Sequence, residues 1–447
     1  MDVLSEIRQS RMSRFQVVAV TIALALILID GFDVAVMAYA APVLSREWDI
    51  DPVTLGFLLS ASLFGMAAGS IFLTPLADRI GRRKLTIISL VIISAGMVLS
   101  VTSTGVAQLM AFRVLTGLGV GGMMANLNVL VAEYASDKRR GSIIGIYTAG
   151  YPIGATVGGL AAGPLIPQFG WQSVFAIGAA LTVLMLVVSW RFLPESLDYL
   201  LTRRPARALE RINAILTGIG KSPVDSLPPV ETAVAEQGAV REVLTRPVRF
   251  RTLMLWTGYA CLVAAYYFAN TWTPKIMATA SGDDSLGVTT GVIANAGGII
   301  GCFIFSALAV KLRSQLLLVV TLVGAALAYV VFGLVFSFIG LAMVLALFLG
   351  ILTTAGIAGF YATSPGVYTA RARATGVGWM IGLGRLVSIV APILVGYLIS
   401  GGLAPQSIFF LFAVPLAAAA LSIVALNASM KRTPSPVVPQ PVPAATH

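Results

Sequence analysis

Histidine and cysteine are nearly absent from this sequence of 447 residues. Its one histidine is His447, and its two cysteines, Cys261 and Cys302, both fall within long apolar runs. These numbers exclude histidine-based metal sites and catalytic triads, and they make a disulfide framework an unlikely basis for the fold. We therefore expect no metal site, no cofactor and no enzymatic activity.

Charged residues are also scarce, at 11% of the chain, whereas 57% of the residues are hydrophobic. Soluble globular domains carry about 25% charged residues, and a membrane-spanning helix needs about 20 apolar residues. The sequence predicts an all-α integral membrane protein with twelve transmembrane helices. The apolar runs lie near residues 17–41, 54–77, 85–104, 107–131, 142–165, 172–193, 252–276, 288–310, 315–337, 340–366, 375–400 and 405–427.

A polar segment divides these runs into two sets of six. We expect an N-terminal six-helix bundle (1–193), a cytoplasmic central loop (194–251), a C-terminal six-helix bundle (252–427) and a disordered, proline-rich cytoplasmic tail (428–447). The central loop should contain a short amphipathic helix, because apolar residues recur there at helical spacing. They are Ala206, Leu209, Ile212, Ile215 and Leu216.

Positive charge is distributed unevenly along the chain, whose net charge is +11. If the N-terminus lies in the cytoplasm, 26 of the 30 lysines and arginines fall in cytoplasmic segments; the others are Arg46, Lys275, Arg113 and Arg385. The positive-inside rule then places both termini in the cytoplasm. Topology accounts for the basic excess, so we expect the lipid bilayer and no nucleic acid as a partner.

Two aspartates, Asp30 and Asp33, interrupt the first apolar run. A carboxylate at the centre of a membrane helix costs about 2.5–3.5 kcal/mol on insertion scales, which indicates a function in a proton or solute pathway. Arg113, at a similar depth in the fourth span, is the expected ionic partner of both acids. Either a static bridge or a switching, proton-coupled bridge fits this pattern, and an interhelical hydrogen-bonding role remains the alternative.

A cluster of charges follows the second span, in Leu76-Ala77-Asp78-Arg79-Ile80-Gly81-Arg82-Arg83-Lys84. We predict a cytoplasmic gate formed by Asp78, Arg79, Gly81, Arg82 and Arg83, in which Gly81 permits the tight turn. Positive-inside anchoring explains the arginines but not the acid. Glu133 is a further gate candidate, and an exposed acid at the helix end is the alternative. The equivalent loop of the second half has Val310 where a repeated gate would have an acid.

Arg385 lies about 16 Å into the eleventh span at 1.5 Å per residue. A guanidinium binds carboxylates through two hydrogen bonds and keeps its proton, so this residue suits an anionic substrate. A bridge to Asp30 or Asp33 is the alternative. Aromatic residues in several spans could pack against other helices, anchor the protein at the membrane–water interface or stack on the planar ring of a substrate. Our candidates for substrate binding are Arg385, Phe32, Tyr266, Asn295 and Trp379.

Several stretches together resemble the aromatic acid:proton symporter family of the major facilitator superfamily. They are DGFDVAVMAYAAPVL (30–44), LADRIGRRK (76–84), RVLTGLGVGGMMANLNVLVAEY (113–134), PESLDYLL (194–201) and RATGVGWMIGLGR (373–385). The resemblance implies two pseudo-symmetric bundles in a bacterial inner membrane, with the solute bound between them. It also implies transport roles for Asp30, Asp33, Asp78, Arg113, Glu133, Arg373 and Arg385. We add Arg373 to the gate candidates on this basis.

Our hypothesis is proton-coupled uptake of an aromatic carboxylate, such as benzoate or a hydroxybenzoate, by alternating access. The proton gradient would be the energy source, and we expect a monomer. Asp30, Asp33 and Arg113 would couple the proton, and Arg385 would hold the carboxylate. The alternatives are a proton-coupled transporter of another organic anion, a drug or metabolite:proton antiporter on the same fold, and a receptor or scaffold that transports nothing.

Overall fold

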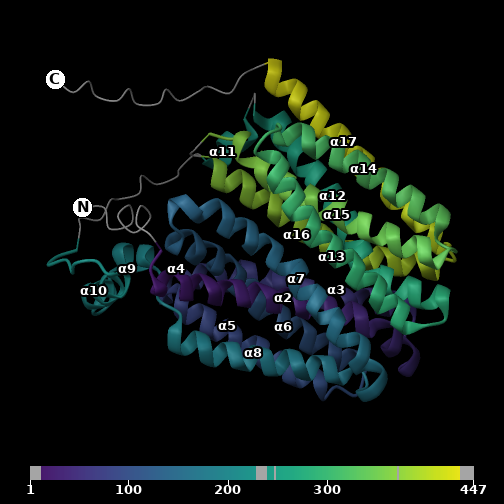
Figure 1. The fold of residues 1–447 in the computed structure, drawn as a ribbon, viewed down its shortest axis with the longest axis horizontal. Coiled ribbons are helices and arrows are strands. Elements are labelled where there is room, and N and C mark those ends of the chain that lie inside the picture. Colours follow the sequence, from purple (N-terminus) through teal and green to yellow (C-terminus); the bar gives the residue numbers. More distant parts are fainter. Residues whose placement is uncertain (1–11, 228–238, 246–247, 370–371, 433–447) are drawn as a thin grey trace.

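The computed structural model describes residues 12–227, 239–245, 248–369 and 372–432, and these residues contain no β-strand. Each predicted span corresponds to one long helix (Figure 1). The helices are α2 (Arg14–Glu47), α3 (Pro52–Phe72), α5 (Arg82–Val101), α6 (Val106–Tyr134), α7 (Asp137–Phe169), α8 (Gln172–Phe192), α12 (Val248–Ser281), α13 (Asp284–Ala309), α14 (Ser314–Val335), α15 (Ile339–Thr363), α16 (Arg373–Ser400) and α17 (Pro405–Arg432).

Eleven of the helices in the described part of the chain are long and apolar enough to cross a membrane. The twelfth long helix, α7, has 33 residues and would extend about 50 Å at 1.5 Å per residue. It packs between α2 of its own half and α13 of the other half. The predicted all-α membrane fold of twelve spans is therefore confirmed.

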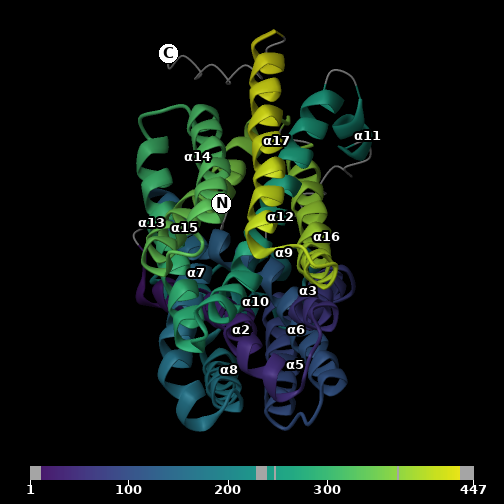
Figure 2. The same cartoon turned by 90° about the vertical axis from the view of Figure 1, so that its right-hand side faces the viewer.

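The helices form two bundles of six, α2 to α8 and α12 to α17 (Figures 1 and 2). The main contacts between the bundles come from α3 with α16, α7 with α13 and α2 with α12, and α2 also contacts α13. Helix α2 is deeply buried, because every residue from Ile29 to Pro42 is shielded from solvent. Ionised side chains in this stretch therefore depend on protein partners rather than on water.

The two bundles are joined at the end that the predicted orientation places in the outer half of the membrane. Arg46 forms an ion pair with Asp284, and Lys275 donates a hydrogen bond to the Ser45 hydroxyl. Nearer the middle, the Ser60 hydroxyl donates to the Ile389 carbonyl oxygen at 2.8 Å. The bundles diverge towards the opposite end (Figure 1), which the distribution of lysine and arginine predicts to be cytoplasmic. With that orientation the arrangement is inward-facing.

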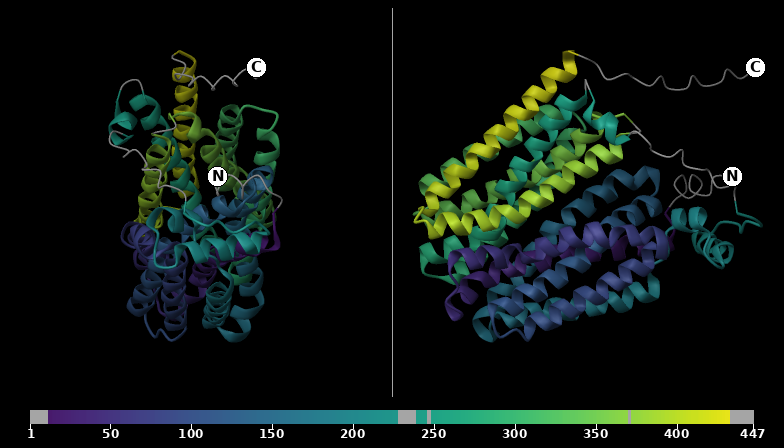
Figure 3. Two further views of the ribbon diagram at one scale, coloured as in Figure 1. Left: turned by 90° about the vertical axis from the view of Figure 1, so that its left-hand side faces the viewer. Right: turned by 180° about the vertical axis from the view of Figure 1, so that it is seen from behind.

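The central segment contains three short helices, α9 (Leu197–Arg203), α10 (Ala208–Ile219) and α11 (Ala239–Leu244). Helix α10 is the predicted amphipathic helix, and its buried face includes Ile212, Ile215 and Leu216. Figure 3 shows α9 and α10 at the cytoplasmic end of the N-terminal bundle, away from the C-terminal bundle.

Helix α17 continues to Arg432, so residues 428–432, which we expected in the disordered tail, are helical. The first proline after this helix is Pro434, and Lys431 and Arg432 suit the negative end of the helix dipole. The rest of the predicted tail lies outside the described residues.

Candidate functional site

Arg113 and Asp33 form a closed ion pair inside the N-terminal bundle. The two terminal nitrogens of Arg113 lie 2.6 and 2.7 Å from the two carboxylate oxygens of Asp33, and one of them also donates to the Asp33 carbonyl oxygen at 3.1 Å. Both side chains are buried, and the guanidinium lies over the Phe175 ring, 5.5 Å from its centroid. Two opposite charges with this geometry neutralise each other, although the Nε of Arg113 is buried without a hydrogen-bond partner among the described residues.

Asp30 is not part of this pair, contrary to our expectation that Arg113 binds both acids. The three-residue spacing turns the two side chains about 60° apart on α2, and only Asp33 faces α6. Asp30 is 3% exposed, and its Oδ1 has no hydrogen-bond partner among the described residues. The cation whose charge acts on Asp30 is Arg385 of the C-terminal bundle. Asp30 therefore faces the boundary between the bundles.

Arg385 lies about 18 Å from the first residue of α16 at 1.5 Å per residue. Its side chain is half-buried, and it forms no salt bridge or hydrogen bond with any residue that the structure describes. Gly378 and Gly382 precede it on the same helix face, and a Cβ built on either would have no neighbour within 4 Å. Open space thus extends from Arg385 towards the cytoplasmic end of α16.

Tyrosines from both bundles surround Asp30 and Arg385. Tyr147 and Tyr151 of α7 interact electrostatically with Asp30, and Tyr267 of α12 interacts with both Asp30 and Arg385. The hydroxyls of Tyr147 and Tyr151 are buried and have no hydrogen-bond partner within the described part of the chain. Three buried oxygens without a partner in this part of the chain, counting that of Asp30, therefore belong to the group around Asp30, and Arg385 is the cation that acts on this acid.

Two further tyrosines extend this group within the C-terminal bundle. The Tyr259 and Tyr361 hydroxyls are 3.1 Å apart, Tyr361 is 38% exposed, and Arg385 and Tyr267 both act electrostatically on Tyr259. The result is an aromatic, polar-edged environment around one cation, which suits a flat anionic ligand.

Tyr266 and Asn295, two predicted substrate-binding residues, line a separate small cavity of about 30 Å³ in the C-terminal bundle. This volume holds about one water molecule and not an aromatic ring. Asn295 is already engaged, because its Nδ2 donates to the Tyr39 hydroxyl at 3.2 Å and to the Gly291 carbonyl oxygen at 3.0 Å. Tyr266 lies in the neighbourhood of Tyr151, one of the tyrosines around Asp30.

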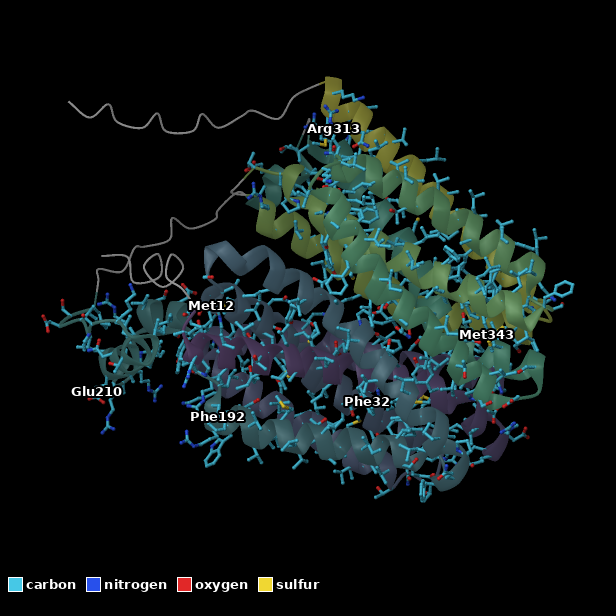
Figure 4. All side chains as sticks on the ribbon, viewed as in Figure 1. Met12, Phe32, Phe192, Glu210, Arg313 and Met343 are labelled. Atoms are coloured by element: carbon cyan, nitrogen blue, oxygen red, sulfur yellow. The ribbon has the colours of Figure 1, made fainter. Side chains whose placement is uncertain are left out.

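Phe32 and Trp379 lie away from Arg385. The Phe32 ring packs against Gly158 and Gly178 within the N-terminal bundle (Figure 4), because two residues along α2 turn it about 200° from Asp30. Trp379 lies six residues before Arg385 on α16 and is 54% exposed. It stacks on Trp256, with ring centroids 5.8 Å apart. Neither residue contributes to the site in this conformation.

The predicted gate charges gather around Glu133 at the cytoplasmic end of the N-terminal bundle. Arg82 Nη1 lies 2.5 Å from Glu133 Oε1, the Ser196 hydroxyl donates to the same oxygen at 2.8 Å, and the Leu197 amide donates to Oε2 at 3.0 Å. Glu133 is buried, so the alternative of an exposed helix-end acid is wrong.

The remaining gate candidates divide into two groups. Gly81 turns the chain with φ 101°, the amide of Arg83 donates to Glu195 Oε1, and the carbonyl of Arg79 accepts from the Tyr199 hydroxyl at 3.3 Å. Asp78 and Arg373 are exposed and are not brought together: Arg373 Nε donates to the Pro365 carbonyl oxygen at 3.2 Å. Asp78 forms no ion pair with a described residue, as expected when the bundles are apart at this end.

Sequence reasoning missed Tyr147 and Tyr151, which supply two of the three unsatisfied oxygens. Their spacing of four residues in Tyr147-Thr148-Ala149-Gly150-Tyr151 places both on one face of α7. That pattern was visible in the sequence, but nothing in it showed that this face meets Asp30.

Comparisons with known proteins agree with this geometry. The family model described as Major Facilitator Superfamily matches residues 23–365. The chain is 29% identical over 446 residues to the benzoate transport protein of Acinetobacter baylyi, covering 97% of this chain and 94% of that protein. It is also 29% identical over 444 residues to the gallate transporter of Pseudomonas putida, covering 98% of each.

Among solved structures, the fold is similar to a bacterial homologue of the human lysosomal transporter Spinster in an inward-facing, unoccupied conformation. The TM-score is 0.67, and the match covers 93% of this chain and 96% of that one. At 18% sequence identity this likeness concerns the fold.

Proposed function

The chain belongs to the major facilitator superfamily, so it is a multi-pass membrane transporter and not an enzyme. We propose that it takes up an aromatic carboxylate together with protons. One observation carries the proposal: Arg385 lies deep in the membrane with no salt bridge to a described residue, beside buried oxygens that lack partners. An embedded cation is costly to maintain, and a pathway for an anion accounts for it.

The substrate class follows from the surroundings of Arg385. Its guanidinium would bind both oxygens of a carboxylate, and the rings of Tyr147, Tyr267 and Tyr361 would pack against a planar ring through offset or edge contacts. The unpaired Tyr151 hydroxyl is available to a polar ring substituent. The names of the relatives, a benzoate and a gallate transporter, support this reading, since both ligands combine a ring with a carboxylate.

Asp30, and not Asp33, is our candidate for the proton carrier. Asp33 is held by Arg113, whereas Asp30 has an unsatisfied oxygen and is acted on by the charge of Arg385. When Asp30 is ionised it neutralises Arg385 and weakens the attraction for a substrate anion. When Asp30 is protonated, Arg385 is free to bind the carboxylate. One proton and one monoanion would then bind cooperatively and move together, without net charge.

The test uses purified protein in liposomes with radiolabelled benzoate. Asp30→Asn mimics the protonated acid, so it should bind benzoate with an affinity that varies little between pH 6 and pH 8 and should retain exchange. It should fail to accumulate benzoate in response to a pH gradient. Arg385→Gln should lose both binding and exchange. Accumulation by Asp30→Asn that equals that of the parent protein would rule out this proton carrier.

Competition experiments address the other candidate functions. If succinate displaces benzoate as well as hydroxybenzoate does, the substrate is an organic anion of another class. If Arg385→Gln still transports benzoate, the carboxylate site lies elsewhere. If the parent protein exchanges a neutral analogue better than benzoate, an antiporter of uncharged compounds replaces uptake of an anion. If the parent protein shows no exchange at all, the receptor hypothesis replaces transport.

A further inference from the structure

A basic pocket of about 440 Å³ lies at the cytoplasmic end of the N-terminal bundle, outside the transport pathway described above. It opens between the first turn of α5, the last turn of α8 and the helix α10. Arg83 and Lys84 contribute from α5, and Arg211 contributes from α10. Figure 4 places Phe192, at the end of α8, and Glu210, on α10, at this end of the molecule.

The pocket has an excess of positive charge and a donor that lacks a partner. Three cations face one acid, Glu195, whose Oε1 already accepts from the backbone amides of Arg83 and Ser196 at 2.9 and 3.0 Å. Arg83 is anchored through its Nη2, which donates to the Trp190 carbonyl oxygen at 2.5 Å. Its Nε is buried without a hydrogen-bond partner among the described residues. An anion with several oxygens would satisfy this donor and offset the charge.

The surface next to the pocket faces lipid. Ile88 on α5 and Val187 on α8 are 45% and 56% exposed in helices that cross the membrane, and Trp190 is 63% exposed at the cytoplasmic end of α8. Tryptophan at this depth is typical of the headgroup region. The pocket therefore lies where the headgroups of the inner leaflet meet the protein, directly above an apolar surface that acyl chains cover.

We propose that this pocket binds the phosphate headgroup of an anionic phospholipid of the inner leaflet. The phosphate would contact Arg83 and Lys84 from the membrane helix and Arg211 from α10, and it would thereby hold α10 against the N-terminal bundle. The acyl chains would follow the exposed faces of α5 and α8. Basic pockets between membrane helices on the cytoplasmic side suit this class of lipid.

The test compares two double variants of the full chain that lose equal charge. Lys84→Gln with Arg211→Gln removes two exposed cations of the pocket. Arg203→Gln with Arg249→Gln removes two exposed cations of the same cytoplasmic surface that do not line it. Each protein is purified in detergent and titrated with phosphatidylglycerol, phosphatidylcholine or inorganic phosphate. Bound lipid is counted by native mass spectrometry, and thermal unfolding is followed in parallel.

We expect phosphatidylglycerol to bind and stabilise the parent protein and the control variant alike, with phosphatidylcholine much weaker. The pocket variant should bind phosphatidylglycerol at least about tenfold more weakly, since each cation near a lipid surface contributes about a fivefold effect. Equal losses in both variants would show that only general surface charge acts and would overturn the proposal. Equal stabilisation by inorganic phosphate would also overturn it, in favour of a site for small anions.

Discussion

Arg113 and Asp33 bind each other through two parallel hydrogen bonds within the N-terminal bundle, while Asp30, three residues earlier on α2, faces the other bundle. The two aspartates that look equivalent in the sequence therefore have different surroundings. Asp33 is held in an ion pair within its own bundle, whereas Asp30 lies at the boundary between the bundles with an oxygen that has no partner among the described residues.

The first prediction concerns the stability of this pair. Asp33→Asn or Arg113→Gln alone leaves one buried charge without its partner, so each should lower the free energy of unfolding by about 3–5 kcal/mol. The double variant should recover a large part of that loss, because no charge remains unpaired. Thermal unfolding in detergent measures all four proteins, and additive losses in the double variant would contradict the pairing.

The second prediction concerns the close approach of α2 and α7 beside Asp30. A Cβ built on Gly31 would lie 2.0 Å from the Tyr151 carbonyl oxygen, so Gly31→Ala should force the helices apart and destabilise the protein by about 1–3 kcal/mol or more. Gly145→Ala, in α7 with no atom within 4 Å of the added Cβ, is the matched control. It should be neutral or slightly stabilising, since alanine favours helix. Unfolding temperatures compare the two, and equal stability would contradict the contact.

The third prediction concerns the ion pair between Arg46 and Asp284, which joins the bundles at the outer surface. Its side chains are 62% and 25% exposed, so it should contribute no more than about 1 kcal/mol. Asp284→Asn should therefore raise the outward-open population by about two- to fivefold.

Labelling of a cysteine introduced at Ser60, a residue buried between the bundles, measures this change after Cys261 and Cys302 are replaced. An impermeant maleimide added from outside should react faster in Asp284→Asn than in the parent protein. Asp49→Asn removes an exposed charge on the same side that forms no salt bridge with a described residue and should have no effect. The difference should shrink at high salt, which screens exposed charges.

The fourth prediction concerns α9 and its attachment to Glu133. Glu133→Gln weakens the bonds from Arg82, Ser196 and the Leu197 amide, so hydrogen exchange of the amides in residues 197–203 should increase by about one to two orders of magnitude, because hydrogen bonds to charged groups contribute about 1.5–3 kcal/mol. Asp198→Asn is the control: its side chain is 54% exposed and 3.3 Å from Arg82, and such surface pairs contribute little. Faster exchange in both variants to the same degree would assign the attachment to Asp198 instead.

The sequence by itself determined the twelve spans and their division into two sets, and it predicts the orientation of the chain. These features depend on local quantities: the length of apolar runs, the polar segment between Pro194 and Arg251, and the distribution of lysine and arginine. The lipid bilayer acts on each segment separately, so a property of each segment is enough to predict it. The embedded charges Asp30, Asp33, Arg113 and Arg385 were identified for the same reason.

Only the tertiary structure decided which of these charges meet. Asp30 and Asp33 are separated by about 60° around α2, and that small rotation assigns one to Arg113 and the other to the neighbourhood of Arg385. Phe32 packs inside its own bundle, and Tyr147 and Tyr151 of α7 lie near Asp30. Sequence periodicity does not give these positions, because packing against neighbouring helices sets the rotation of each helix. A helical period tells which residues share a face, but the partner of that face is fixed only when the bundles assemble.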